Sequence, residues 1–293
     1  MQHVFDRKQI AHQRSRFRTS ETDDRYFLFD WTMREITDRL SIVRRNFPAC
    51  LTIGGRGKAA TFPDHGTQAY MTLDAATSLL PARGGIIAEE DFLPIGKQSI
   101  DLAVSALCLH TVNDLPGALL QIRESLKPDG LFLAGMFGGE TLRELRECLY
   151  EAEIELRGRV SPRVAPFADK PQMGSLMQRA GFALPVVDSE ILTVTYDNIF
   201  ALMHDLRMMG EANAVKERTK NFTPRSVFLR AGELYAARHA DPDGRIRASF
   251  EIIFLLGWAP HETQQKPLRP GSAQTRLADF LGTEEIGTGE KPH

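Results

Sequence analysis

The first residues in the sequence whose types could do chemistry form a glycine-rich turn, Gly54-Gly55-Arg56-Gly57, and an acid, Asp74. Each directly follows or ends an apolar run of strand length. Glycine lets the backbone approach a ligand closely, and a glycine turn can open a helix toward an anion. A carboxylate at Asp74 can accept two hydrogen bonds from the hydroxyls of a ribose. The residues alone leave open an ordinary tight turn and a helix N-cap.

More acids follow the third apolar run. The carboxylate of Glu89 stands where it can accept a hydrogen bond from the exocyclic amine of an adenine. We interpret its neighbours Glu90 and Asp91 as a solvated acidic turn, which is the usual state of a short run of charges. Glu89 is therefore the candidate ligand-binding acid of this segment.

The fourth apolar run contains Ser105 and is followed by His110, Asn113 and Asp114, near where a substrate is expected to lie. A histidine titrates close to neutral pH and can accept a proton during a reaction. A lone histidine is, however, more often a structural hydrogen-bonding group, and an acid before Leu-Pro-Gly is also a good helix cap. Both interpretations of this segment remain open.

The elements that must position these residues alternate between two kinds. From about residue 48 to residue 137, apolar runs of strand length alternate with segments of helical periodicity, which predicts βα units and a parallel sheet. In an open α/β sheet, ligands bind beyond the carboxyl ends of the strands, where the strand order reverses. We therefore expect the four segments to meet at one sheet edge. The runs span residues 49–53, 69–73, 85–88, 100–107 and 131–137.

The second half of the chain continues with fewer strands. A helix is predicted over residues 140–157, followed by a loop or lid over residues 158–170 and a short helix near residues 173–180. Strands are predicted over residues 184–196 and 246–257, with helices near residues 198–209 and 224–239 between them. The segment from about residue 264, rich in Pro, Gly, Thr and Glu, is predicted to be loosely ordered.

Composition excludes several classes of protein. The 293 residues contain 36 Lys and Arg against 38 Asp and Glu, and this balance argues against nucleic acid as the main partner. No apolar stretch approaches the ~20 residues of a membrane span. Three separated cysteines without a CxxC motif, and an N-terminus without the apolar core of a secretory signal, indicate a reducing, cytoplasmic setting. The basic N-terminus is interpreted as a solvated helix, with Arg7, Lys8, Arg14, Arg16 and Arg18.

The four segments in this order, with Leu126-Lys-Pro-Asp-Gly130 after them, resemble a class I S-adenosylmethionine-dependent methyltransferase. Further motifs resemble the family of respiratory complex I assembly factors that act as protein arginine hydroxylases, whose bacterial relatives are described as malonyl-carrier-protein methyltransferase-like. The likeness runs from Phe5-Asp-Arg7 to about Gly282. Its motifs include Arg45-Asn-Phe-Pro48, Phe92-Leu-Pro94, Val112-Asn-Asp-Leu-Pro116, Gly135-Met-Phe-Gly-Gly139, Ser161-Pro-Arg163, Arg179-Ala-Gly-Phe182, Met209-Gly-Glu-Ala-Asn213 and Gly257-Trp258.

The resemblance implies a fold and a domain plan. The expected fold is α/β: a doubly wound, mostly parallel, seven-stranded Rossmann-like sheet with a helical insertion and a C-terminal elaboration. The N-terminal helical segment would span residues 1–44, and the methyltransferase-like domain residues 45–263, with its insertion at about 158–182 and its helical elaboration at about 198–240. A loosely ordered tail would span residues 264–293. Because the likeness starts almost at Met1, we expect a bacterial, cytoplasmic member without a presequence.

The resemblance also implies a site. S-adenosylmethionine would be bound by Gly54, Gly55, Gly57, Asp74, Glu89 and Ser105, and the catalytic segment would contain His110, Asn113 and Asp114. The implied partner is a protein, the quinone-proximal iron–sulfur subunit of complex I, with peripheral association to the membrane complex and no nucleic acid. No His, Asp and distant His stand at the spacing of a facial metal triad, so no metal is predicted.

The sequence departs from the family pattern at four positions. Thr52 replaces an acid before the glycine turn, Arg56 and Lys58 stand where glycine is usual, and Thr111 replaces an aromatic residue. Three functions follow as hypotheses. The first is hydroxylation of an arginine in a complex I subunit, the second is O-methylation of a small-molecule or carrier-bound carboxylate, and the third is a degenerate scaffold in which Arg56 and Lys58 contact an anion or a protein. An enzyme is favoured.

Overall fold

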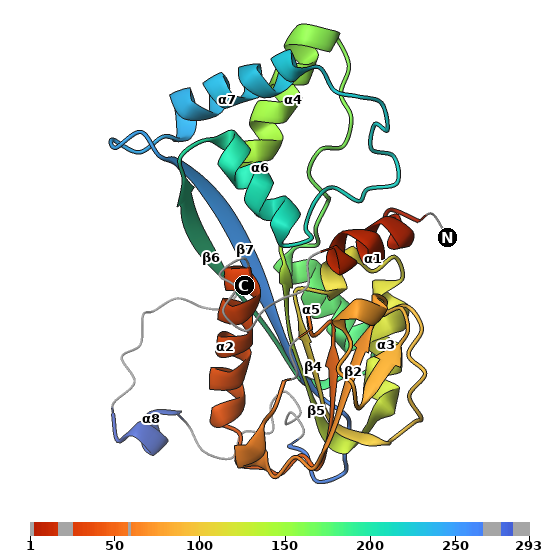
Figure 1. Ribbon diagram of the computed structural model, residues 1–293. Coiled ribbons are helices and arrows are strands. Elements are labelled where there is room, and N and C mark those ends of the chain that lie inside the picture. Colours follow the sequence, from red (N-terminus) through yellow and green to blue (C-terminus); the bar gives the residue numbers. More distant parts are fainter. Residues whose placement is uncertain (1–2, 17–25, 58–59, 266–276, 284–293) are drawn as a thin grey trace. The chain divides into compact units, whose positions relative to one another are not determined.

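The sheet of this protein has seven strands in the order β3-β2-β1-β4-β5-β7-β6 (Figure 1). The computed structural model describes residues 3–16, 26–57, 60–265 and 277–283. The first five strands are parallel, and β7 runs antiparallel to both of its neighbours. This order confirms the predicted doubly wound, mostly parallel α/β sheet. The strands are β1 Ala49–Ile53, β2 Ala69–Asp74, β3 Gly85–Ile87, β4 Ile100–Ala106, β5 Leu126–Phe137, β6 Ala183–Tyr196 and β7 Ile246–Trp258.

The strand order reverses at β1, which lies between β2 and β4. Ile53 is in register with Leu73 on one side and with Ser105 on the other. The ends of these three strands, and the segments that follow them, therefore meet at one edge of the sheet, as the βα pattern predicts.

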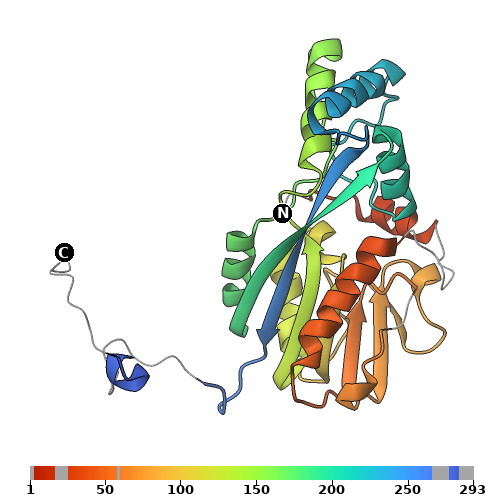
Figure 2. The same cartoon turned by 90° about the vertical axis from the view of Figure 1, so that its left-hand side faces the viewer.

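Helices cover both faces of the sheet. On one face, α2 (Phe27–Ser41) buries Leu28 and Ile36 in the same apolar cluster as Leu102. On the other, α3 (Leu115–Ser125) and α5 (Lys170–Arg179) pack against Ala103 and its neighbours. Successive strand residues point to opposite faces, so the two apolar layers account for the mostly apolar sequences of the central strands. Figure 2 shows α2 and α5 on opposite sides of the sheet.

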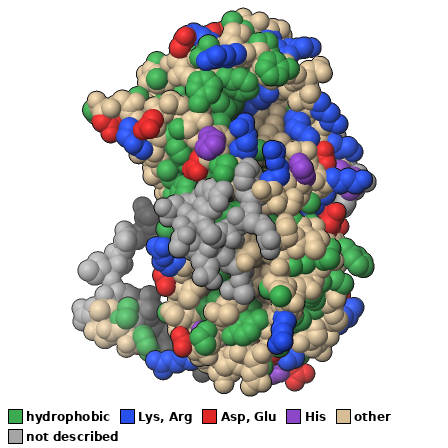
Figure 3. Space-filling view, viewed as in Figure 1, with side chains coloured by type: hydrophobic (Ala, Val, Ile, Leu, Met, Phe, Trp, Pro, Cys, Tyr) green, Lys and Arg blue, Asp and Glu red, His purple; other side chains and the backbone are tan. Residues whose placement is uncertain are grey.

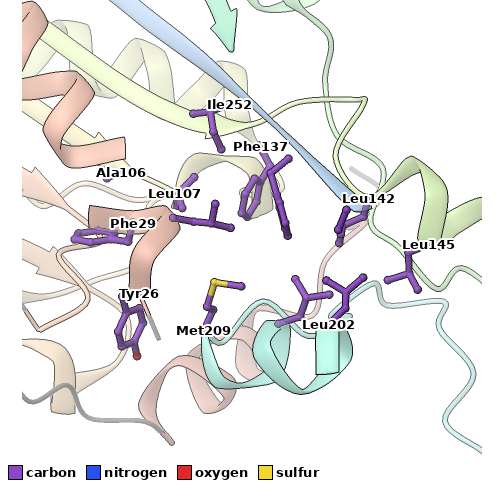
Figure 4. Close-up of a cluster of buried hydrophobic side chains, with 14 of the residues drawn as sticks. Tyr26, Phe29, Ala106, Leu107, Phe137, Leu142, Leu145, Leu202, Met209 and Ile252 are labelled. Atoms are coloured by element: carbon purple, nitrogen blue, oxygen red, sulfur yellow. The ribbon is translucent and has the colours of Figure 1, made fainter. Parts of the chain in front are cut away.

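A helical layer stands beyond the carboxyl ends of the parallel strands, carried by the long strands β6 and β7. It contains α4 (Arg143–Arg157), α6 (Ile199–Met208) and α7 (Arg225–His239). Figure 4 shows how Phe137 of β5, Leu142 just before α4, Leu145 of α4 and Leu202 of α6 point toward one another, so a continuous apolar core joins this layer to the sheet.

The surface of the helical layer keeps several large apolar side chains exposed among Lys and Arg, and Figure 3 shows such a mixture at the top of the molecule. They include Tyr150 and Ile154 of α4, Phe200 of α6 and Leu229 of α7. Two ion pairs between α4 and α7, Arg230–Glu155 and Arg238–Glu151, hold the helices together on this exposed face.

Three elements begin three or more residues from their predicted starts, among them α5, which begins at Lys170 rather than near residue 173. The helix predicted from residue 140 begins at Arg143, because Glu251 holds the preceding turn: its carboxylate accepts from the Glu140 N–H at 3.0 Å, and its carbonyl from the Thr141 hydroxyl. Residues 127–130, predicted only to end a helix, form the first part of β5.

The chain divides into two compact units, residues 1–260 and residues 261–293. The first contains the sheet and helices α1 (Arg7–Ser15) to α7. The second contains the short helix α8 (Leu277–Leu281). Most of the tail predicted to be loosely ordered, residues 266–276 and 284–293, lies outside the described residues. Among the helices of the described residues, none is long and apolar enough to cross a membrane.

Candidate functional site

The glycine turn after β1 packs directly against the turn after β4. Gly54 has φ +76°, and its N–H donates to the carbonyl of Leu73 at 2.8 Å. A Cβ at this position would lie 2.5 Å from Sγ of Cys108, so both the conformation and the space require glycine. Gly55 is buried, whereas Gly57 is exposed with φ +80°.

Asp74 and Ser105, at this sheet edge, each have a buried oxygen without a hydrogen-bond partner among the described residues. Oδ1 of Asp74 accepts from the N–H of Ala76 at 2.8 Å, but Oδ2 has no partner. The Oγ of Ser105, at the end of β4, is in the same state. A buried polar atom without a partner is costly, so these oxygens suit a ligand that brings its own donors.

The buried acid of the third segment is Glu90 rather than Glu89. Glu89 keeps 51% of its side chain exposed and lies 3.6 Å from Nε of Arg7. Glu90 is 1% exposed and forms ion pairs with Arg7 and Arg14. The interpretation of Glu90 as part of a solvated turn is therefore wrong, because two guanidinium groups compensate its carboxylate inside the protein.

The N-terminal helix supplies those two cations. Arg14 is 3% exposed, and its guanidinium donates to Oε1 of Glu90 at 3.1 Å, to Sγ of Cys108 at 3.3 Å and to Oγ1 of Thr111 at 3.2 Å. The predicted solvated basic helix is thus wrong for Arg7 and Arg14. A signal was present in the sequence: Arg7, Ile10 and Arg14 share one helix face, and Ile10 is buried.

His110 is buried in the turn Leu109–Thr111 and lies between two aromatic rings. Its ring centroid is 4.7 Å from that of Phe137 and 5.5 Å from that of Phe167. Its Nε2 lies 3.1 Å from Oε2 of Glu211, while Nδ1 has no hydrogen-bond partner among the described residues. Burial lowers the pKa of His110, although Glu211 opposes the shift, so the imidazole is neutral at pH 7.

Glu211 keeps its charge despite burial. Burial raises the pKa of a carboxyl group, but attraction from Arg56 and His110 outweighs it and holds the pKa of Glu211 at about 2. An ionised carboxylate accepts the Nε2 proton of a neutral imidazole, which leaves the lone pair on Nδ1. The motif Met209-Gly-Glu-Ala-Asn213 carried the only sequence signal for Glu211, as a resemblance without a role.

Two of the departures from the family pattern, Arg56 and Thr52, are buried in the protein. Arg56 has φ +52° and points inward, where its Nη2 donates to the carbonyl of Leu107 at 2.9 Å and pairs with Glu211. Thr52 is buried within β1. Lys58 lies outside the described residues. Arg56 is therefore part of the interior, in contrast to the expected contact with an external anion or protein.

Asn113 and Asp114 make contacts that organise the chain. The side chain of Asn113 accepts from the N–H of Phe5 at 2.8 Å and donates to its carbonyl at 3.1 Å. Asp114 caps α3 by accepting from the N–H of Gly117 at 3.0 Å. The capping alternative thus has a direct contact, and the catalytic roles of His110, Asn113 and Asp114 remain predictions.

A cavity of about 210 Å³ opens beside the segment that follows β4, where Thr111 lines it. Thr111 and Glu211 line it on the side of the sheet edge. Its remaining walls are mainly apolar and come from the helical layer and the preceding loop; they include Leu142, Leu145, Phe167, Met203, Leu206 and Phe228. Within the described residues, no His, Cys, Asp and Glu side chains form a group of three or more that could hold a metal ion.

The carboxyl edge of the sheet has groups that would favour binding of S-adenosylmethionine and one that would oppose it. The unpartnered Oδ2 of Asp74 and Oγ of Ser105, beside a buried glycine turn, fit a ligand with ribose hydroxyls such as S-adenosylmethionine. Arg14 places a positive charge beside the buried acid Glu90 of the same edge. A cationic ligand bound at this edge would therefore be repelled by the guanidinium group of Arg14.

The chain is similar to proteins of known family. Residues 69–134 match the model of a methyltransferase domain. A Danio rerio protein named "Arginine-hydroxylase NDUFAF5, mitochondrial" is 36% identical over 288 residues, which cover 94% of this chain and 89% of the relative. The protein of the same name from Dictyostelium discoideum is 46% identical over 200 residues, which cover 68% of this chain and 46% of that longer relative.

A bacterial methyltransferase and one solved structure are also similar to this chain. A "Malonyl-[acyl-carrier protein] O-methyltransferase" from Xylella fastidiosa (strain M23) is 36% identical over 168 residues, covering 57% of this chain and 55% of the relative. The crystal structure of the YcgJ protein from Bacillus subtilis superposes with a TM-score of 0.53 at 13% identity, covering 78% of this chain and 99% of that one. With the domain match, it confirms the expected class I methyltransferase fold.

Proposed function

Because the chain belongs to the family of the NDUFAF5 arginine hydroxylases, we propose that it is an enzyme that hydroxylates an arginine of a protein substrate. The proposed substrate is the quinone-proximal iron–sulfur subunit of respiratory complex I, modified during assembly. The observation that carries the proposal is the 36% identity that continues over 94% of the chain, well beyond the methyltransferase core at residues 69–134.

We propose that S-adenosylmethionine binds at the carboxyl edge of β1, β2 and β4. Asp74 would accept from the ribose hydroxyls, the turn Gly54, Gly55 and Gly57 would bring the backbone close to the ligand, and Glu89 would face the adenine amine. Ser105 would offer its hydroxyl. When bound, this cofactor supplies an activated methyl group on a positively charged sulfur. The unpartnered oxygen of Asp74 supports this assignment.

His110 is the proposed proton acceptor. Its neutral ring and the contact of Nε2 with Glu211 leave the lone pair on Nδ1, which is the atom that would accept a hydrogen bond or a proton from the bound substrate. Phe137 and Phe167 hold the ring from two sides and exclude water. Asn113 and Asp114 would position this segment through their contacts with Phe5 and α3.

A second candidate function is O-methylation of a small-molecule or carrier-bound carboxylate. The similarity to the Xylella fastidiosa methyltransferase favours it, over a little more than half of the chain. Such a reaction needs mainly the positioning and desolvation of an existing carboxylate nucleophile.

The product distinguishes the two functions. The complex I subunit would be isolated from cells that carry the wild-type gene, a deletion, a His110→Gln variant or a His204→Gln control, whose histidine is exposed. Mass spectrometry should find one added oxygen atom on an arginine with the wild type and the control, and none with the deletion or His110→Gln. Addition of one methylene group to a carboxylate would support the second function. A defect in complex I assembly in the deletion, with no modified residue in the wild type, would leave only a scaffold role.

A further inference from the structure

Two buried glutamates in this protein each bind two guanidinium groups. Glu90 pairs with Arg7 and Arg14. Glu153, 1% exposed, pairs with Arg157 at 3.1 Å and with Arg163. One carboxylate has room for two such partners, because its two oxygens offer about four acceptor positions.

Glu211 has half of this arrangement. Its Oε1 pairs with the guanidinium of Arg56, and within the described residues the other oxygen accepts from the neutral imidazole of His110 alone. Its side chain keeps 11% exposure, and it lines the cavity beside the catalytic segment. The carboxylate therefore reaches the cavity wall with acceptor positions still available.

The cavity matches a side chain in size and polarity. Its volume of about 210 Å³ is below the ~300–1,000 Å³ of pockets that hold whole small molecules. Leu142, Leu145, Phe167 and Leu206 offer apolar walls for a chain of methylene groups. An arginine has such an apolar stem with a planar cation at its end, and that cation pairs well with a carboxylate.

We propose that this cavity binds the side chain of the substrate arginine and that Glu211 binds its guanidinium group. The identity of the bound side chain rests on the proposed function. Bound in this way, the arginine would lie beside Thr111 and His110, next to the sheet edge. Glu211 would then hold two guanidinium groups, as Glu90 and Glu153 do.

Cations also line the cavity, so the competing ligand is an anion. The guanidinium of Arg163 is held by Glu153 and by the hydroxyl of Thr223 at 2.9 Å. Arg207 lines the cavity from an exposed position. An anionic ligand would depend on Arg207, but an exposed charge is screened by water and interacts weakly, whereas Glu211 acts in a largely dry site. These arguments favour a cation.

The test measures binding by calorimetry, with N-acetyl-arginine amide as the probe and N-acetyl-citrulline amide as its neutral counterpart. The wild-type protein should bind the arginine probe at least tenfold more tightly than the citrulline probe, a difference of about 1.4 kcal/mol. Glu211→Gln should abolish this preference. Glu140→Gln, at an exposed glutamate paired with Arg143, should keep it.

A second variant guards against misfolding. Met203→Trp would fill the cavity from a half-buried position without touching the Glu211–Arg56 pair, and should also prevent binding while the protein stays folded. Equal binding of both probes, no binding of the arginine probe to the wild type, or unchanged binding in Glu211→Gln would each overturn the inference. Binding that depends on Glu211, without any modified arginine in cells, would instead refute the proposed function alone.

Discussion

The Nε2 of His110 lies 3.1 Å from the Oε2 of Glu211, a residue 101 positions further along the chain. This contact joins the turn after β4 to the segment after α6, and Arg56 joins both to the turn after β1. Three segments that are distant in sequence therefore share one buried charge cluster. Both the proton-accepting histidine and the proposed arginine site depend on its charge state.

The cluster predicts a loss of stability in acid. The pKa of Glu211 is held at about 2, below the ordinary 4.5, so the unfolded chain binds more protons than the folded one across this interval, and stability falls as pH falls through it. His110, whose pKa is lowered from 6.5, adds a decline that begins near that pH. Urea denaturation from pH 7 to pH 3 should show both.

The variant Glu211→Gln separates these contributions. At pH 7 it should lose ~3 kcal/mol of unfolding free energy, because it removes the negative charge that compensates the buried guanidinium of Arg56. Its stability should then depend less on pH than that of the wild type below pH 5. Glu140→Gln serves as the control, and parallel curves for Glu211→Gln and the wild type would contradict the pKa assignment.

Arg14 predicts an effect on cofactor affinity. Removing its guanidinium in Arg14→Ala removes a positive charge from the acidic edge that would receive the cationic cofactor. We expect calorimetry to show about tenfold tighter binding of S-adenosylmethionine, or about 1.4 kcal/mol, together with a loss of ~3 kcal/mol in stability. Lys8→Ala removes the same charge from the exposed side of α1 and should change neither quantity. Unchanged or weaker cofactor binding in Arg14→Ala would refute competition.

Removing the charge of Asp74 should weaken cofactor binding, which is the opposite of the effect expected for Arg14→Ala. Asp74→Asn keeps an oxygen that can accept from the N–H of Ala76 and removes the charge from the oxygen without a partner. Each charged hydrogen bond is worth ~1.5–3 kcal/mol, so affinity for S-adenosylmethionine should fall at least tenfold while the midpoint of thermal unfolding changes little. Asp64→Asn, in the short turn Pro63–His65, is the matched control. Retained affinity in Asp74→Asn would place the ribose elsewhere.

Asn113 predicts a change in the N-terminal segment. Its two hydrogen bonds to the backbone of Phe5 hold the residue that leads into α1. Asn113→Ala should remove ~2 kcal/mol, at about 1 kcal/mol for each bond, and hydrogen exchange should become faster in residues 5–15 than in the sheet. A variant that loses activity while exchange in α1 stays slow would support a direct catalytic role instead.

The sheet was predictable because its signals are local. The mostly apolar, unalternated sequences of residues 49–53 and 100–106 reflect burial on two faces, and the strands follow their runs closely. The capping role of Asp114 was also visible, since an acid before Leu-Pro-Gly caps a helix wherever it occurs.

The charge cluster was not predictable in the same way. Glu90 and Glu211 look like solvated acids in the sequence, because nothing local shows that Arg14 or Arg56 will reach them across 76 and 155 positions. Ion pairs follow no periodicity, and the fold decides which charges meet. The spacing of Arg7 and Arg14 shows that they share a helix face, but it does not say that this face is buried.

The place of β7 between β5 and β6 has a consequence for synthesis on the ribosome. β6 pairs only with β7 within the sheet, and its residues are made well before those of β7, which begins at Ile246. While the chain emerges at ~5–20 residues per second, β5 and β6 both wait with open edges that attract other strands. The nascent chain therefore needs protection from aggregation until β7 pairs with both β5 and β6.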